Sequence, residues 1–316
     1  MNRKRDMNVV FMGTPQFAIP SLMMLINEKY NIVCVVTQPD RKKGRGGGVF
    51  QSPVKMLALA NDLKVYQPVN IKSDDAYREI GELQPDLLIT VAYGGIIDKR
   101  LLDMPRFGCV NVHGSLLPKY RGSAPIQWAI INGDCETGVT TMLTDVGVDT
   151  GCILLQDRIT LTKEMYFPEA HDKLADIGAS TLKRTIPLWV EGKLTPRLQN
   201  DAEATRARML SKDDGKLNLK KSANEVVNLV RGLYPWPGAY LLAEAKKIKI
   251  IKAHVADGSR AETNAEAGTV IEISREGLIV KCGVGAAVIT ELQFENGRVM
   301  NIGECWHNLK IARFDV

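Results

Sequence analysis

The sequence predicts an α/β domain with a parallel sheet, followed by a smaller β-barrel domain. Three observations lead to this fold class. Short β-branched runs alternate with amphipathic helical stretches over the first two thirds of the 316 residues. Near residue 190 the chain becomes polar and loses any clean period. From about residue 207 onward, short β-type segments follow one another with glycines between them, which is typical of a small antiparallel barrel.

Apolar, β-rich runs in the first part of the chain predict strands, and amphipathic stretches between them predict helices. The strands cover residues 8–13, 31–38, 86–92 and 109–114, and the helices cover 15–28 and 53–63. This order implies a parallel sheet with helices on both faces. Ligands of such sheets bind beyond the carboxyl ends of the strands, where Tyr93, Asn111 and His113 lie. The G-x-G-x-x-G motif is absent, so NAD binding is not supported.

The polar stretch 190–206 suits a linker that crosses the surface. We therefore divide the chain into a domain of residues 1–189, a linker of residues 190–206 and a β-rich domain of residues 207–316. The strands expected in the last domain cover residues 247–256, 268–274, 277–283 and 285–294.

Composition narrows the class of protein further. A 45% apolar and 24% charged composition is typical of a soluble globular chain, and no apolar run approaches the roughly 18 residues of a membrane span. The first residues predict a strand, not a signal peptide. Six cysteines without a C-x-x-C pair predict reduced thiols in a cytoplasmic protein. No metal-ligand spacing occurs, so we expect no metal, and the net charge of +5 permits an anionic partner.

Three polar residues in the stretch 108–151 can form an acyl-transfer site without a nucleophilic serine or cysteine. Asn111 and His113 share one face of a strand by its two-residue period, and Asp149 follows in a glycine-rich loop. An imidazole can accept a proton from an attacking amine, and a carboxylate can orient the imidazole. A carboxamide can donate hydrogen bonds to a developing oxyanion.

Each of these residues also has an ordinary interpretation when it is taken alone. An Asn-x-His pair at a strand end is more often part of a hydrogen-bonded turn, and an aspartate before Thr-Gly is usually a turn residue. Asp145, four residues before Asp149, is expected to have such a structural role. The conjunction of all three residues with the surrounding motif favours catalysis.

The stretch NVHGSLLPKYRGSAPIQWAI resembles the signature of the folate-dependent formyltransferases. That family carries its catalytic asparagine and histidine in N-x-H-x-S-L-L-P, which matches Asn111 and His113, and its catalytic aspartate in D-x-G-x-D-T-G, which matches Asp149. The resemblance implies a Rossmann-like first domain, an OB-like barrel after it, and 10-formyltetrahydrofolate as co-substrate. Lys119, Tyr120 and Arg121 depart from the family pattern beside the predicted pocket.

The same resemblance implies which residues contact the folate. The segment VAYGGII resembles a segment that lines the folate pocket in the family, and SLLP is expected to hold the pterin largely by backbone contacts. The implied folate-binding residues are Ala92, Tyr93, Gly94, Ser115, Leu116, Leu117 and Pro118.

Two further segments resemble the tRNA-directed members of the family, which formylate the amino group of methionyl initiator tRNA. They are the basic, glycine-rich stretch 37–55 and PWPGAY at 235–240. A basic loop can order on a nucleic acid, although it is more often a plain solvated loop. The implied tRNA-binding residues are Arg41, Lys42, Lys43, Arg45, Lys247 and Lys249.

Two alternatives stay open from the sequence. A formyltransferase that acts on a small amine would share the catalytic stretch but would not need the basic loop. An RNA-binding protein on a degenerate transferase fold would not need the three polar residues. We expect a monomer without a membrane partner.

Overall fold

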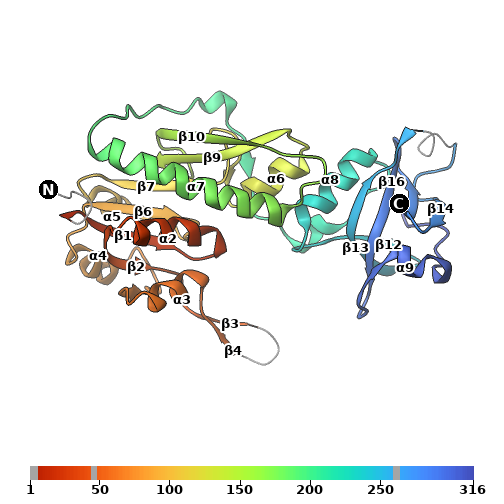
Figure 1. The fold of residues 1–316 in the computed structure, drawn as a ribbon, viewed down its shortest axis with the longest axis horizontal. Coiled ribbons are helices and arrows are strands. Elements are labelled where there is room, and N and C mark those ends of the chain that lie inside the picture. The colour runs from red at the N-terminus through yellow and green to blue at the C-terminus, as the bar shows by residue number, and fades with distance from the viewer. Residues whose placement is uncertain (1–5, 44–47, 259–263) are drawn as a thin grey trace. The chain divides into compact units, whose positions relative to one another are not determined.

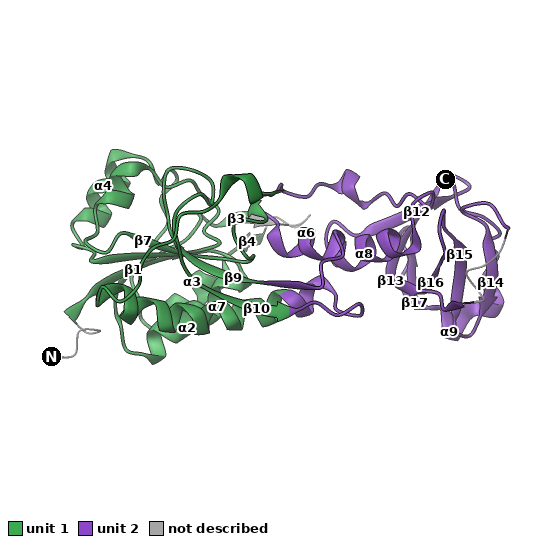
Figure 2. Cartoon of the chain, turned by 90° about the horizontal axis from the view of Figure 1, so that it is seen from above, with its two compact units in different colours: residues 1–122, 138–159, 171–206 green, residues 123–137, 160–170, 207–316 purple. Residues whose placement is uncertain are grey.

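The computed structural model describes residues 6–43, 48–258 and 264–316 (Figure 1). The chain forms two compact units, each built from more than one stretch of sequence (Figure 2). Unit 1 contains residues 1–122, 138–159 and 171–206, and unit 2 contains residues 123–137, 160–170 and 207–316. Within the described residues, no helix has the length and apolar character that a membrane crossing requires.

A seven-stranded sheet forms the centre of unit 1, in the order β10-β9-β7-β6-β1-β2-β5. Its strands are β1 (Asn8–Gly13), β2 (Asn31–Val36), β5 (Val65–Tyr66), β6 (Leu87–Val91), β7 (Cys109–His113), β9 (Glu136–Leu143) and β10 (Ile153–Thr160). Along the sheet, the five neighbouring strands β7, β6, β1, β2 and β5 pair in parallel, as predicted. Strand β9 pairs with β7 antiparallel, so the sheet is mixed.

The helices of unit 1 are α2 (Ile19–Asn27), α3 (Pro53–Ala60), α4 (Asp74–Gly81), α5 (Lys99–Asp103) and most of α7 (Phe167–Val190), with the 3₁₀ turns η1 (Gln16–Ala18) and η2 (Asp201–Glu203). The helix predicted over 15–28 is split, because Pro20 has no N–H for the carbonyl of Gln16 and instead lies in the first turn of α2. Helix α3 begins where Ser52 accepts a hydrogen bond from the Lys55 amide.

Helices cover both faces of the sheet. Figure 2 shows α2 and α7 along one face and α4 on the other. Apolar residues of α4 and α5 pack on Val10, Met12 and Leu88. On the opposite face α7 approaches the sheet so closely that a Cβ on Gly178 would lie 2.9 Å from a methyl of Val112. Cys109 belongs to the α4 face, so Asn111 and His113 also lie on that face.

Two small two-stranded sheets complete the strands of this part of the chain. The hairpin of β3 (Arg41–Lys43) and β4 (Gly48–Phe50) leaves the end of β2, and β8 (Arg121–Gly122) pairs with β11 (Arg206–Ala207). The hairpin coincides with the predicted basic loop.

The β-rich part of unit 2 is a six-stranded sheet of order β12-β13-β16-β15-β14, with β17 paired to β16. The strands are β12 (Ala239–Ala243), β13 (Lys246–Val255), β14 (Val270–Ser274), β15 (Gly277–Lys281), β16 (Ala286–Phe294) and β17 (Val299–Asn301). The other elements are α6 (Pro125–Ile131), η3 (Lys212–Gly215), α8 (Ala223–Leu233), α9 (Ile302–Cys305) and η5 (Trp306–Asn308).

Residues 312–315 close this sheet on itself. The amide of Phe314 donates to the carbonyl of Gly268 beside β14, and the amide of Asp315 donates to the carbonyl of Leu242 in β12. The two outer strands are thus bridged, which leaves no open edge between them. Phe314 is fully buried in the core of the barrel, together with apolar residues of α8. The predicted small β-barrel is therefore confirmed.

Candidate active site

Asn111 and His113 lie at the carboxyl end of β7, with their side chains on one face of the sheet. Thr90 is the cross-strand neighbour of Asn111 on β6. Its hydroxyl donates a hydrogen bond of 2.9 Å to Asn111 Oδ1. The amide oxygen is therefore occupied, and the amide Nδ2 has no acceptor among the described residues. Asn111 thus presents N–H donors beyond the strand end.

A buried thiol supports the direction of this hydrogen bond. Cys109 Sγ lies 4.0 Å from Thr90 Oγ1 and donates to it. Burial raises the pKa of Cys109 to about 11, so the thiol stays protonated at neutral pH. A hydroxyl that accepts from Cys109 donates its own proton to Asn111.

The imidazole of His113 has a partner at each nitrogen. Nε2 lies 2.9 Å from the carbonyl oxygen of Tyr120, which can only accept, so Nε2 carries a proton. Nδ1 lies 3.6 Å from Oδ2 of Asp149. The same Oδ2 accepts a hydrogen bond of 2.8 Å from the Gly122 amide. In the neutral ring, Nδ1 is therefore the basic nitrogen, and it faces the carboxylate.

Strained backbone marks this part of the sheet edge. Three non-glycine residues around the site have positive φ: Ala92 at 47°, Tyr120 at 62° and Asp149 at 54°. Such conformations persist only where the surrounding structure enforces them, and they are concentrated at functional sites.

The loop that carries Asp149 is held by its own side chains. Asp145 accepts hydrogen bonds from the Gly147 amide and from the hydroxyl of Thr150, which is the predicted structural role. A Cβ on Gly151 would lie 1.8 Å from a backbone oxygen, so only glycine fits there.

A side chain that the sequence analysis did not single out also holds this loop. Gln199 donates from Nε2 to the carbonyl oxygens of Asp149 and Gly151, each at 2.8 Å. Its Oε1 accepts from Nε of Arg121 at 3.0 Å. No local pattern predicts these bonds, because Gln199 lies 50 residues from Asp149 in the chain.

The residues predicted to bind folate occupy two turns at the same edge. Ala92 and Gly94 are exposed at the end of β6, whereas Tyr93 is buried. Burial raises the pKa of Tyr93 to about 12, with a smaller effect of Tyr66, so Tyr93 is a neutral phenol. The Thr14 hydroxyl fixes this turn by donating to the carbonyl of Tyr93.

In the second turn, two of the side chains predicted to bind folate make contacts within the protein. The hydroxyl of Ser115 donates to the carbonyl of Lys119, and the side chain of Leu117 is buried. Leu116 and Pro118 are half-buried.

The main chain of Ser115 and Leu117 is also bonded within the protein. The Ser115 carbonyl accepts from the Thr140 hydroxyl. The amide and carbonyl of Leu117 bond to Thr140 and Gln156. Ser115 and Leu117 therefore hold the shape of this turn.

The base of the basic hairpin is anchored by a carboxylate. Asp40 accepts from Lys55 Nζ at 2.6 Å and from Gln67 Nε2 at 2.8 Å, and these hydrogen bonds lower the pKa of Asp40. Lys55, which the sequence places among the basic residues of the loop, is thus paired. Arg41 is exposed.

The structure does not test the predicted tRNA contacts of the other basic side chains of the hairpin. Arg45 lies outside the described residues, and of Lys42 and Lys43 only the main chain is described.

The lysines of β13 differ in their surroundings. Alternation places Ile248 and Ile250 in the core and leaves Lys249 exposed, as predicted. Lys247 Nζ lies 3.7 Å from the ring centroid of Tyr240, which is a cation–π contact. Lys252 is paired with Glu291 at 2.8 Å.

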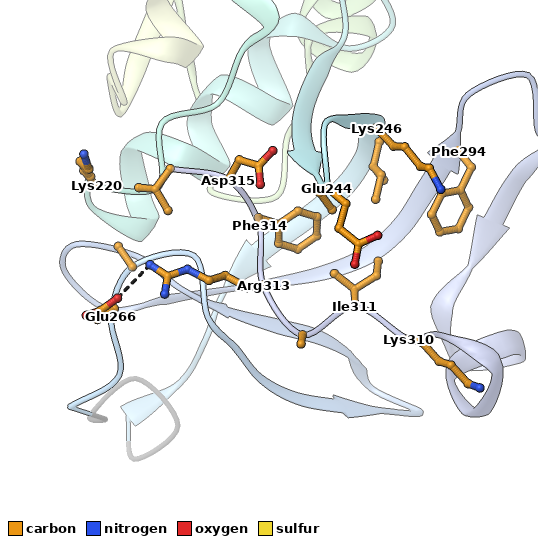
Figure 3. Close-up of a pocket in the computed structure, with 15 residues that line it drawn as sticks. Lys220, Glu244, Lys246, Glu266, Phe294, Lys310, Ile311, Arg313, Phe314 and Asp315 are labelled. Carbon is orange, nitrogen blue, oxygen red and sulfur yellow. Dashed lines mark ion pairs between the residues drawn. The ribbon is translucent and has the colours of Figure 1, made fainter.

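A cavity of about 780 Å³ lies in unit 2, lined in part by Lys246, Phe294 and Arg313 (Figure 3). Arg313 is paired there with Glu266. None of its lining residues is a predicted catalytic or folate-binding residue. Among the described residues, no group of three or more His, Cys, Asp or Glu side chains could hold a metal ion.

An amide donor and an imidazole–carboxylate pair at one sheet edge can serve acyl transfer, and the chain matches family models of that class. Residues 7–186 match the formyl transferase family, and residues 209–310 match the formyl transferase C-terminal domain. The chain belongs to the formyl transferase family.

Among curated relatives, the chain is similar to methionyl-tRNA formyltransferases over almost its whole length. That of Acetivibrio thermocellus is 48% identical over 305 residues, covering 96% of this chain and 97% of the relative. That of Ruminiclostridium cellulolyticum is 46% identical with the same coverage.

Solved structures show the same fold. The N-formyltransferase from Helicobacter canadensis, in complex with folinic acid and dTDP-3-aminofucose, has a TM-score of 0.68 and 20% identity, covering 90% of this chain and 98% of that one. The methionyl-tRNA formyltransferase from Clostridium thermocellum has a TM-score of 0.55 and 16% identity, covering 80% of this chain and 95% of that one.

Proposed function

We propose that the protein transfers the formyl group of 10-formyltetrahydrofolate to the free amino group of methionyl initiator tRNA, giving N-formylmethionyl-tRNA. The observation that carries this proposal is the approach of His113 Nδ1 to the Asp149 carboxylate beside the amide of Asn111. The likeness to methionyl-tRNA formyltransferases over 96% of the chain supports the choice of acceptor.

Asn111 is the proposed oxyanion donor. The formyl oxygen gains negative charge as the amine attacks, and an N–H donor aimed at that oxygen stabilises the transition state. The hydrogen bond from Thr90 occupies Oδ1, so Nδ2 is the atom that Asn111 offers. A donor fixed before the reaction begins needs no reorganisation when the charge develops.

His113 is the proposed proton carrier. Formation of the new C–N bond releases a proton from the amine, and cleavage of the old C–N bond requires a proton on the leaving nitrogen N10. His113 can accept the first proton at Nδ1 and return it to N10, so the protons balance. While the ring carries both protons, it faces the Asp149 carboxylate and the Tyr120 carbonyl, which both stabilise that form.

The residues of the two turns suit a folate. 10-Formyltetrahydrofolate would supply the formyl carbon and the leaving nitrogen. Ala92 and Gly94 are exposed at the end of β6, so this turn offers main-chain hydrogen-bond partners for a pterin, and the buried Tyr93 anchors it in the core. Leu116 and Pro118 add half-buried apolar surface, and Ser115 and Leu117 hold the turn that presents it.

Basic residues in both units would bind the tRNA. Arg41 on the hairpin, with Lys42, Lys43 and Arg45, would contact the acceptor end, and Lys247 and Lys249 would contact the phosphate backbone. Exposure of Arg41 and Lys249 supports this assignment. Residues 1–189 would then form the catalytic domain and residues 207–316 the tRNA-binding domain.

We further propose that the protein acts in the cytoplasm as a monomer. The six thiols are all free, which fits a reducing compartment. Light scattering of the free protein and of its complex with tRNA measures the oligomeric state, and a stable dimer in both would contradict the monomer.

Product analysis tests the proposed activity. The protein is incubated with 10-formyltetrahydrofolate and either charged initiator tRNA or small amines such as an amino-sugar nucleotide. We expect formylmethionyl-tRNA from the first mixture, and a fall of at least 10²-fold in turnover for His113→Ala and Asp149→Ala. Product from small amines only, or near-full turnover of either variant, would contradict the proposal.

A further inference from the structure

Residues 197–205, here called the strap, run beside both loops that hold His113. Arg197 pairs with Ile153 next to the Asp149 loop through two backbone hydrogen bonds of 2.8 and 2.9 Å. Eight residues later, Thr205 binds the turn that contains Tyr120. The sequence predicts only a polar linker here. In the structure, the strap contacts both loops that carry the partners of the His113 imidazole.

We propose that Gln199 is a positioning residue of the formyl transfer reaction, which holds the Asp149 carboxylate in register with His113. This inference rests on the proposed function. Gln199 does not touch the reacting atoms. It acts through the main chain of the loop, since its amide donates to the carbonyl oxygens of Asp149 and Gly151.

The side chain of Gln199 is itself held in one orientation. Its Oε1 accepts from Nε of Arg121, and Nη2 of the same guanidinium binds Oδ1 of Asp201 at 2.7 Å. With the oxygen so occupied, the two N–H groups of the amide point at the two carbonyls of the loop. A glutamine anchored at both ends can therefore set the position of the loop.

Asp149 needs an external support because its backbone conformation is unfavourable. Its φ of 54° lies in the left-handed region, which residues other than glycine adopt uncommonly, although aspartate tolerates it better than most. The hydrogen bonds from Gln199 flank this residue, one on its own carbonyl and one two residues later. If they are lost, the loop can relax, and only the Gly122 amide then holds the carboxylate near Nδ1.

The strap fixes the second partner of the imidazole as well. Thr205 Oγ1 accepts from the amide of Tyr120 at 2.8 Å, and the carbonyl of Thr205 accepts from the amide of Arg121 at 2.8 Å. The carbonyl of Tyr120 is the group that binds His113 Nε2. Both nitrogens of His113 thus face groups that the strap holds in place.

Two substitutions separate positioning from general stability. Gln199→Leu removes all three hydrogen bonds at similar volume. Gln199→Glu keeps the acceptor for Arg121 but places a carboxylate against two carbonyl oxygens. Leu198→Ala, at a neighbouring side chain that is 83% exposed, is the matched control. Circular dichroism and thermal unfolding establish which variants fold. If Gln199→Leu does not fold, Gln199→Glu provides the test.

Single-turnover formylation of charged initiator tRNA is the readout. We expect both Gln199 variants to lower the rate constant about 10- to 100-fold, since a misplacement of about 1 Å has effects of that size. In steady-state assays the KM values for both substrates should stay within about twofold, and Leu198→Ala should match the wild type in both measurements.

A double-mutant cycle gives the decisive comparison. If Gln199 acts through the Asp149 carboxylate, Gln199→Leu has little further effect in an Asp149→Asn background. An equal fall in both backgrounds, or a folded Gln199→Leu protein with wild-type rate, would overturn the role of Gln199. A wild-type protein that forms no formylmethionyl-tRNA would instead overturn the proposed function, so the two failures are distinguishable.

Discussion

Replacing Thr90 by valine removes one hydroxyl from the edge of the site and leaves the shape of the side chain almost unchanged. In the wild type this hydroxyl donates to Asn111 Oδ1 and thereby directs Nδ2 beyond the strand end, where the proposed reaction places the formyl oxygen. Valine cannot donate, so the two orientations of the amide become similar in energy. We therefore expect Thr90→Val to lower kcat while KM for folate and for tRNA changes little.

The size of the effect follows from one neutral hydrogen bond. Such a bond contributes about 0.5–1.5 kcal/mol net, and each 1.36 kcal/mol corresponds to a tenfold change in rate. Thr90→Val should therefore lower kcat about 2- to 12-fold. Asn111→Ala removes the donor itself and should cost about 10²- to 10³-fold. Thr90→Ser keeps a hydroxyl and should stay close to the wild type.

Steady-state formylation of charged initiator tRNA measures these values, and Thr141→Val is the matched control. Thr141 is also buried in the same sheet, but its hydroxyl bonds to Thr185 on α7 and accepts from the Leu155 amide on β10. Its loss should lower the midpoint of thermal unfolding without lowering kcat. If Thr90→Val keeps the wild-type kcat, or loses as much as Asn111→Ala, the Thr90 hydroxyl does not act by orienting the amide.

Three further predictions concern the loop and the hairpin. Gly151→Ala should destabilise the fold by about 1–3 kcal/mol, because its Cβ would meet a backbone oxygen at 1.8 Å; thermal unfolding checks this against Gly48→Ala, whose Cβ meets nothing within 4 Å. Lys55→Met should raise the pKa of Asp40 toward its ordinary value of about 3.9, as seen by NMR titration. Folding lowers the pKa of Asp40, so the contact with Lys55 stabilises the fold at pH values above the ordinary pKa of an aspartate. This stabilisation is lost as the pH falls through the pKa that Asp40 has in the folded protein. An unchanged titration of Asp40 in Lys55→Met would contradict the proposed anchor. Arg41→Ala should weaken tRNA binding and reduce the slope of log affinity against log salt by about one, and an unchanged slope in filter binding would exclude a phosphate contact.

The sequence predicts those parts of the fold that a local period encodes. The two-residue alternation of CVNVH placed Asn111 and His113 on one face, and the same alternation in β13 separated Ile248 from Lys249. It also predicted the parallel strands. The reversal of β9 was not predicted, because strand direction depends on pairing with β7 and leaves no local pattern.

The supports of the site were missed for a similar reason. Thr90 lies in a buried strand where a threonine is an ordinary β-former, and only the register of β6 on β7 reveals its partner. Gln199 stands in a stretch without a period, and its three hydrogen bonds join residues that are 48, 50 and 78 positions away. Lys55 is the last residue of the basic stretch 37–55, yet a carboxylate 15 residues earlier neutralises it.

In the proposed reaction, the geometry of His113 links proton transfer to attack of the amine. Nε2 is committed to the carbonyl of Tyr120, so Nδ1 alone can exchange a proton. In the neutral ring, Nδ1 and Oδ2 of Asp149 are two acceptors 3.6 Å apart, a distance longer than a hydrogen bond. A proton from the attacking amine turns this contact between two acceptors into an ion pair. Attack at the formyl carbon and pairing of His113 with Asp149 therefore support each other, and the carboxylate contributes most where the charge on the ring is greatest.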